Sequence, residues 1–152
     1  MTEPLKLGWR EWCSLPDLNI AAIKAKIDTG AKTSALHAYQ VDPFIQDGCD
    51  MVRFLIHPIQ KNNTFSLECT APIKDQREVS DSGGHKEMRY IIETRVVIGD
   101  KARLIEMSLT NRDTMRFRML LGRRAMEEHT LVDPAASYLN GRINALRLYG
   151  LK

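Results

Sequence analysis

Apolar and polar residues alternate with a period of two along several short segments, and this pattern constrains the fold more than any other feature of the chain. Successive side chains of a β-strand point to opposite faces, so alternation predicts strands with one buried face. The segments are 20–27, 51–56, 89–98, 103–109 and 115–121. Short strands separated by turn signals predict an antiparallel, mostly-β domain.

Helical patterns are scarce. Residues 123–129 are rich in helix formers and predict one short helix late in the chain. A second, shorter helix is predicted to begin after Lys32, with Thr33 or Ser34 as its N-cap. Near the end, Asn140-Gly141 is typical of a type I′ turn in a β-hairpin.

The length of 152 residues predicts a single domain over 1–152. The 22 Lys and Arg exceed the 19 Asp and Glu by a formal +3, a surplus too small to predict direct nucleic-acid binding. No apolar run approaches the roughly 18 residues of a membrane helix. Residues 1–12 carry charges and Trp where a signal peptide is apolar. We therefore expect a cytoplasmic protein with no membrane partner.

The three cysteines, Cys13, Cys49 and Cys69, form no Cys-x-x-Cys pair. Their odd number and spacing disfavour both a disulfide framework and a four-cysteine zinc site. Each lies in or beside an apolar segment, which predicts a small buried side chain.

The most polar stretch of the chain covers residues 74–86 and has Ser82-Gly83-Gly84 near its centre. Such a segment predicts an exposed hairpin or a disordered loop. If a site lies nearby, the same segment would serve as a flap over it.

The sharpest local motif is Asp28-Thr29-Gly30, which directly follows the alternating segment 20–27. Alone it is a weak signal, because Asp and Gly are common in turns that end strands. Its significance increases with a second element, Met119-Leu120-Leu121-Gly122-Arg123, an apolar segment that ends in Gly. In aspartic proteases an Asp-Thr-Gly loop is backed by a hydrophobic-hydrophobic-Gly strand, and a flap lies between them in sequence, in the same order as here.

Three stretches, 26–38, 84–94 and 109–124, together carry a resemblance that reaches across most of the chain. On these residues the chain resembles the retropepsin-like aspartic proteases, and more closely the bacterial RimB type often labelled "ATP-dependent zinc protease". The resemblance implies a retropepsin-like closed β-barrel lobe with its active site at a homodimer interface.

Hydrolysis by aspartates requires two carboxylates that share one proton around a water molecule. The ionised group takes a proton from the water, and the neutral group donates one to the substrate carbonyl. The chain has a single Asp-Thr-Gly, so the pair requires Asp28 from two copies that meet on a two-fold axis. By the resemblance, Thr29 would hydrogen-bond across that axis, and Gly30 would let backbone approach the water.

Basic residues surround both motifs. Lys24, Lys26 and Lys32 flank Asp28, and five arginines lie within 112–124. A solvated strand face is one interpretation of this charge. The other is a basic cleft that attracts an acidic peptide.

The RimB type is associated with trimming glutamate tails from a ribosomal protein, so the resemblance implies an acidic, glutamate-tailed substrate. The candidate substrate-binding residues are Ala31, Lys32, His37, Gly83, Gly84, Arg89 and Arg116. Of these, Lys32, Arg89 and Arg116 would bind carboxylates through charge-assisted hydrogen bonds.

The sequence supports neither part of the "ATP-dependent zinc" label. It contains no His-Glu-x-x-His and no Gly-x-x-x-x-Gly-Lys-Ser/Thr phosphate loop. We therefore expect no metal and no cofactor. Two alternatives to a homodimeric aspartic peptidase stay open: a non-catalytic retropepsin-like module that binds a peptide, and a zinc peptidase whose ligands only the fold brings together.

Overall fold

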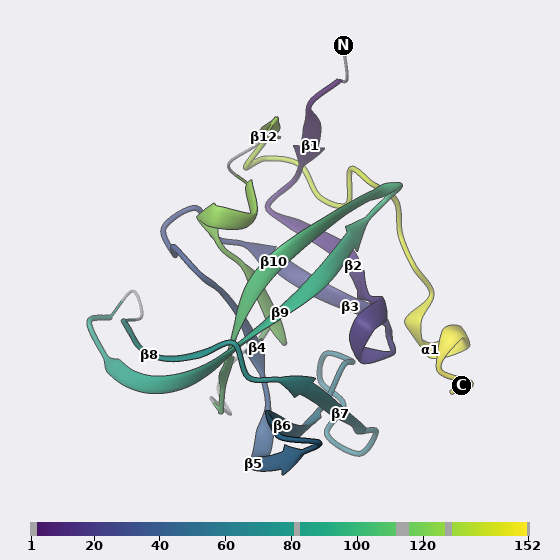
Figure 1. The fold of residues 1–152 in the computed structure, drawn as a ribbon. Helices are drawn as coiled ribbons and strands as arrows, with labels where there is room; N and C mark the ends of the chain where they lie inside the picture. The colour runs from purple at the N-terminus through teal and green to yellow at the C-terminus, as the bar shows by residue number, and fades with distance from the viewer. Residues whose placement is uncertain (1–2, 81–82, 112–115, 127–128, 152) are drawn as a thin grey trace.

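The computed structural model describes residues 3–80, 83–111, 116–126 and 129–151 (Figure 1). The elements of these ranges, in chain order, are β1 (Leu5–Leu7), β2 (Arg10–Leu15), the 3-10 helix η1 (Pro16–Leu18), β3 (Ile20–Ile27), β4 (Ser34–His37), β5 (Tyr39–Gln46), β6 (Cys49–Ile56), β7 (Leu67–Pro72), β8 (Asp75–Ser80), β9 (Lys86–Ile98), β10 (Lys101–Thr110), β11 (Met119–Leu121), the 3-10 helix η2 (Arg123–Met126), β12 (Thr130–Val132) and α1 (Ala145–Leu148). The predicted mostly-β class is confirmed.

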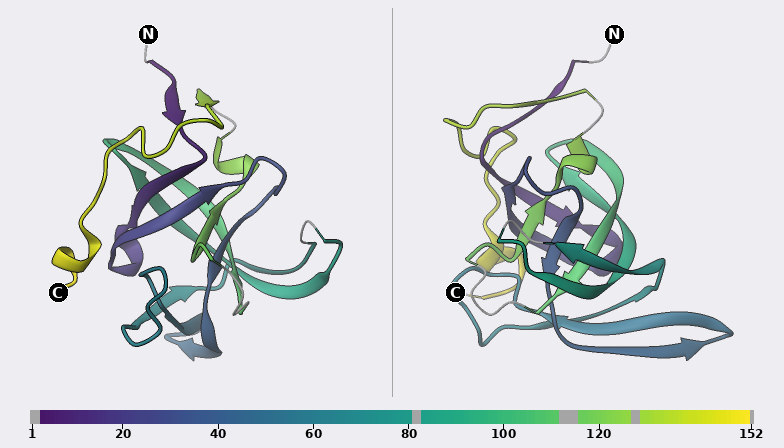
Figure 2. Two further views of the ribbon diagram at one scale, coloured as in Figure 1. Left: turned by 180° about the vertical axis from the view of Figure 1, so that it is seen from behind. Right: turned by 90° about the vertical axis from the view of Figure 1, so that its left-hand side faces the viewer.

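Six strands pair in a succession that returns to its start. The order is β10-β4-β11-β3-β2-β9, and β9 pairs again with β10. Within it, β4 runs parallel to β10 and β3 runs parallel to β11. Figure 2 shows from two further sides how these strands cross one another. A closed barrel with its active site at a homodimer interface stays a prediction.

The core lies among these strands. Ile23, Leu36, Met107 and Met119 come from four different strands, and each is fully buried. Burial of such a side chain is worth about 1.5–3 kcal/mol relative to exposure. The strands that carry the candidate site are therefore held by a shared apolar interior.

A three-stranded antiparallel sheet, β5-β6-β7, adjoins this core. The alternation predicted for 51–56 is confirmed: Val52, Phe54 and Ile56 are buried in the core, and Arg53 is exposed. Burial on one face and solvent on the other is what the period of two requires.

The predicted polar segment forms an exposed hairpin made of β8 and the first half of β9 (Figures 1 and 2). Pairing runs from Asp75 opposite Ile91 to Ser80 opposite Lys86. Ser82 lies outside the described residues. We call residues 75–91 the flap hairpin, because the ribbon projects away from the core.

The base of the flap hairpin is fixed to β10 by a two-pronged ion pair. The Arg77 guanidinium donates from Nη1 to Glu106 Oε1 at 2.8 Å and from Nη2 to Oε2 at 3.1 Å. Lys74 lies 3.3 Å from the same carboxylate. The hydrogen bonds from Arg77, followed by those from Lys74, lower the pKa of Glu106 to about 2.

The helix predicted after Lys32 is wrong. Residues Ser34–His37 form β4, which pairs with β10 on one side and with β11 on the other. Every residue of β4 is buried, so the segment shows no alternation by which a strand could be recognised. Pairing across the fold therefore overrode the local capping signal.

Two further predictions hold only in part. The helix expected over 123–129 is a 3-10 helix over Arg123–Met126, and 127–128 lie outside the described residues. The strand expected over 115–121 covers only Met119–Leu121; residues 116–118 bend, and Met115 is not described.

The predicted hairpin at Asn140-Gly141 is wrong, because neither flank of this dipeptide is a strand. The segment instead packs on the buried Glu11, whose carboxylate accepts from the backbone N–H groups of Gly8 (2.7 Å), Leu139 (2.9 Å) and Asn140 (3.1 Å). The Asn140 side chain donates to it as well, at 3.2 Å. Glu11 thus joins an early and a late part of the chain.

Cys13 and Cys69 are buried as predicted, whereas Cys49 is exposed at the start of β6. The prediction for Cys49 was wrong because this residue directly follows the solvent-exposed turn at 47–48, and the buried apolar residues begin only further along the strand. No helix among the described ranges is long and apolar enough to cross a membrane.

Candidate active site

The Asp28 loop begins where β3 ends. The Asp28 N–H donates to the Leu121 carbonyl at 2.9 Å, which anchors the loop on β11. Its carboxylate accepts from the Gly30 N–H at 3.0 Å, in the local turn geometry that Asp favours. Asp28 is half-buried, while Thr29 and Gly30 are exposed, so the carboxylate is fixed in place and remains accessible.

The segment after β11 packs directly against this loop, as the pair of sequence motifs predicts. The backbone N–H of Arg123 donates to the Ala31 carbonyl at 2.6 Å, and the N–H of Arg124 donates to the Lys32 carbonyl at 3.1 Å. The Arg123 guanidinium donates to the Thr29 carbonyl at 3.0 Å. These three bonds hold the exposed turn in one conformation.

Gly122 allows this close approach. A Cβ at position 122 would lie 2.6 Å from the Thr33 carbonyl carbon and 2.8 Å from the Ser34 nitrogen, distances that no side chain tolerates. The Gly122 N–H donates to the buried Ser34 hydroxyl at 2.9 Å. The motif that ends in Gly is thus required by backbone contact.

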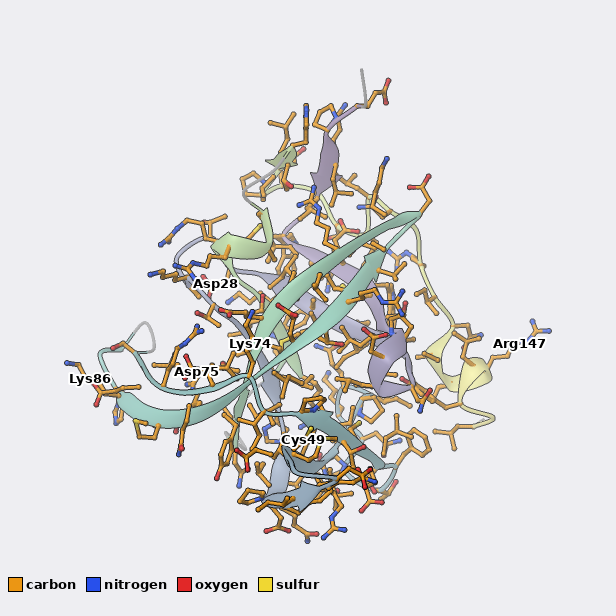
Figure 3. All side chains as sticks on the ribbon, in the orientation of Figure 1. Asp28, Cys49, Lys74, Asp75, Lys86 and Arg147 are labelled. Carbon is orange, nitrogen blue, oxygen red and sulfur yellow. The ribbon has the colours of Figure 1, made fainter. Side chains whose placement is uncertain are left out.

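Asp28 opens into a cavity of about 680 Å³ between its loop, the 3-10 helix η2 and the flap hairpin. The lining residues are Asp28, Gly30, Ala31, Lys32, Thr33, Ala35, Arg77, Glu78, Val79, Ser80, Arg89, Thr110, Leu120, Arg123 and Arg124. In Figure 3, Asp28 lies on the side of the molecule from which the hairpin projects, with Lys86 toward the far end of that hairpin. We call this space the Asp28 cavity.

Cations dominate the lining of the Asp28 cavity. Lys32, Arg77, Arg89, Arg123 and Arg124 contribute positive charge, against the carboxylates of Asp28 and Glu78. Arg77 is paired with Glu106, and Arg124 lies 4.0 Å from the same carboxylate, whereas Lys32 and Arg123 are exposed. A cavity of this charge attracts anions.

Arg89 is held rigidly in the wall. It is only 7% exposed, and its guanidinium donates to Glu87 Oε1 and, at 3.2 Å, to the Ser108 hydroxyl. Ser108 in turn donates to the Ser34 carbonyl at 3.1 Å, beside Gly122. A buried guanidinium fixed by such bonds presents its charge at a defined position.

The structure brings together five of the predicted site residues and separates the others. Asp28, Gly30, Ala31, Lys32 and Arg89 all line the Asp28 cavity. Thr29 belongs to the same loop but is not among the lining residues.

The remaining predicted residues lie elsewhere. Gly83 and Gly84 are exposed at the end of the flap hairpin and are not part of the lining. Arg116 is exposed, and its carbonyl accepts from the Gln60 side chain at 3.2 Å. His37 is buried and lines a different cavity together with Arg118, so the fold does not bring it to Asp28.

Arg77 and Thr110 line the cavity but are not among the predicted site residues. In β8 the side chains of Arg77 and Val79 are half-buried, while those of their neighbours are exposed. A strand with one half-buried face could have been recognised from this alternation. Charged residues lie on both faces of β8, however, so the sequence does not show which face is inward. Thr110 has no local signal, because its position depends on the pairing of β10 with β4.

No three His, Cys, Asp or Glu side chains gather at metal-binding distances anywhere in the described ranges.

The strand-ending Asp-Thr-Gly loop, the Gly-terminated strand packed on it and the hairpin over the cavity define a retropepsin-like domain. A family model described as "Retropepsin-like aspartic endopeptidase RimB" matches residues 6–143. The chain belongs to this RimB-like family.

Two curated relatives are described as "Probable alpha-L-glutamate ligase". The protein from Shewanella pealeana is 43% identical and the one from Shewanella halifaxensis 44% identical, each over 96% of this chain and 32% of the relative. The chain thus spans about a third of the length of these relatives. Among solved structures, the Legionella pneumophila protein Lpg0085, described as of unknown function, superposes with a TM-score of 0.75 at 28% identity. That match covers 90% of this chain and 98% of the Legionella chain.

Proposed function

We propose that the chain is an aspartic peptidase that hydrolyses peptide bonds with a water held between the Asp28 carboxylates of two copies. The observation that carries the proposal is the placement of Asp28: a half-buried carboxylate, fixed by the Gly30 and Leu121 backbone, at the mouth of a large cavity. Glu78, the other carboxylate of the described lining, comes from the flap hairpin. A symmetric pair of equivalent acids therefore calls for a second copy.

The proposed reaction needs no group beyond the two acids and water. The ionised Asp28 takes a proton from the water as its oxygen attacks the peptide carbonyl carbon, and the neutral Asp28 donates its proton to the carbonyl oxygen. Return of a proton to the amide nitrogen lets the C–N bond break. Because the two acids share one proton, their loops must hold still, which the bonds from Arg123 and Arg124 favour.

The substrate that fits this cavity is an acidic peptide, in particular a glutamate-tailed protein. The five lining cations would provide the attraction, and Lys32 and Arg89, which line the cavity with Asp28, would bind carboxylates of the substrate. The relatives' names also concern glutamate, which supports a glutamyl chain as the common substrate.

A second candidate function is a non-catalytic module that holds a glutamyl chain. The observation that favours it is the match to about a third of relatives named as probable glutamate ligases, where such a module could serve a neighbouring activity. On this view Asp28 would be dispensable for binding.

The experiment that separates the two functions uses a peptide with a C-terminal oligoglutamate tail. Wild type should shorten the tail over time, measured by mass spectrometry, and Asp28→Asn should lower the rate by at least about 100-fold, because it removes the acid and base of the reaction. Asp47→Asn is the matched control, since Asp47 is exposed in the β5–β6 turn and its left-handed φ of 52° suits Asn. Intact tails with wild-type protein of proven dimeric state would favour the binding module.

Removal of metals tests the zinc alternative. Dialysis of wild type against a strong chelator should leave the cleavage rate unchanged, because the proposed chemistry uses only carboxylates and water. The same rate assay measures it. Loss of activity that zinc restores would overturn the proposal.

A further inference from the structure

A second, smaller cavity of about 270 Å³ lies beside the Asp28 cavity. It is lined by His37, Tyr39, His57, Asn63, Asn111 and Arg118. We call it the Arg118 cavity. Among these lining residues there is a guanidinium, two imidazoles, two amides and a phenol, and no carboxylate.

The floor of the cavity carries an incompletely bonded guanidinium. Arg118 is only 7% exposed, and its Nη2 donates to Asn63 Oδ1 at 2.8 Å. Its Nε–H is buried and has no hydrogen-bond partner. Among the described residues no carboxylate lies within ion-pair distance of this side chain. A buried charge with an unused donor is costly unless an anion or acceptor meets it.

The walls of the cavity are aromatic and polar, and its volume suits a small anion. Tyr39 and His57 stack at 4.6 Å between ring centroids, and His57 Nδ1 donates to the Phe65 carbonyl at 3.1 Å, which holds the pair upright. Asn63 and Asn111 are exposed at the mouth, so a ligand enters past their amides. A carboxylate is the acceptor that best matches the free guanidinium donor.

The register of β4 against β11 places the two cavities side by side. Leu120 lies opposite Ala35, and both line the Asp28 cavity. His37 follows Ala35 by two residues, and Arg118 precedes Leu120 by two. The His37 N–H donates to the Arg118 carbonyl at 2.8 Å, and both residues line the Arg118 cavity. Because Ala35 and His37 both belong to β4, they share one face of the strand and are about 6.6 Å apart.

An extended peptide has the same spacing between alternate side chains. We propose that the Arg118 cavity is a carboxylate subsite that takes the side chain of an acidic residue two positions along the peptide from the residue held in the Asp28 cavity. The anion site follows from Arg118 itself, whereas its assignment to a peptide rests on the proposed function. The subsite would select chains with acidic residues at alternate positions, as every oligoglutamate has.

Binding measurements test the subsite without hydrolysis. Two proteins are compared by calorimetric titration with pentaglutamate: Asp28→Asn, and Asp28→Asn that also carries Arg118→Gln. Pentaglutamine serves as the uncharged ligand. We expect Arg118→Gln to weaken pentaglutamate binding at least about tenfold, as loss of a charged hydrogen bond does, and to leave pentaglutamine binding unchanged. The control Arg53→Gln removes an exposed cation outside both cavities and should change either affinity less than about twofold. Equal effects of Arg118→Gln and Arg53→Gln would overturn the subsite.

A measurement on unsubstituted Arg118 covers the case in which Arg118→Gln does not fold. In ¹⁵N-labelled Asp28→Asn protein, the Arg118 Nε–H resonance, assigned through its own bonds, should move downfield as pentaglutamate is added and stay in place with pentaglutamine. An unmoved resonance at saturation would exclude the subsite even if wild type cleaves glutamate tails. A moved resonance without any cleavage by wild type would exclude the peptidase and keep the subsite.

Discussion

At the scale of single residues, the geometry of Asp28 depends on positions that carry no charge. Gly122 lets the backbone of Thr33 pass within contact distance, and the segment behind it then supplies the donors that fix Ala31 and Thr29. The position of the Asp28 carboxylate therefore depends on the absence of a side chain at Gly122.

Substitution of Gly122 tests that dependence. We expect Gly122→Ala to destabilise the fold by about 1–3 kcal/mol, because its Cβ must displace rigid backbone. Chemical denaturation measures the change. Gly48→Asn provides the control, because nothing lies within 4 Å of a Cβ there and Asn tolerates its φ of +78°. If Gly122→Ala were no more harmful than the control, the packing argument for the loop would fail.

At the scale of elements, the Glu106 carboxylate joins the β8 side of the flap hairpin to β10. Glu106 on β10 receives Arg77 from β8, and Lys74 lies just before that strand. The pKa of Glu106 in the folded chain is about 2, below the ordinary 4.5 of a Glu carboxyl. The pairing therefore stabilises the fold fully above pH 4.5, and this stability is lost as pH falls toward 2.

Because the pKa of Glu106 is lowered in the fold, acid should loosen the flap hairpin. Hydrogen exchange of the β8 amides should accelerate as pH is lowered from about 4.5 to 2, after correction for intrinsic rates, and Glu106→Gln should show fast exchange at all pH values with a flatter profile. Glu68→Gln is the control, because its loose ion pair with Arg53, at 3.8 Å, lies on other strands. An unaltered profile in Glu106→Gln would show that the hairpin is held by other contacts.

The elements also show what the sequence can and cannot predict. β3 and β6 follow from alternation because each has one face in the core. β4 could not be predicted from alternation, because strands pair with it on both sides and all of its residues are buried. The Asp28 loop is a local motif and could be found, whereas Arg77 and the Arg118 cavity depend on pairing between distant strands, which local patterns do not encode.

At the scale of the whole molecule, the proposed chemistry makes the active unit a pair of chains. One copy holds a single Asp28, so the proposed proton-sharing pair requires a second copy. Activity should therefore depend on concentration near the dissociation constant of the dimer.

Mixing experiments measure this directly. When wild type and Asp28→Asn are re-equilibrated in equal amounts at constant total protein, random pairing leaves about one quarter of the dimers with two acids. Initial cleavage rates should fall to that fraction, while mixtures with Asp47→Asn keep the full rate. A fall to one half would mean that each chain works alone.

The hydrogen bond from Arg123 to the Thr29 carbonyl joins residues 94 positions apart. During synthesis the Asp28 loop therefore lacks its supporting strand until residues 119–124 have also emerged from the ribosome. Such long-range closure is slow, so the loop that carries Asp28 reaches its final geometry late in folding.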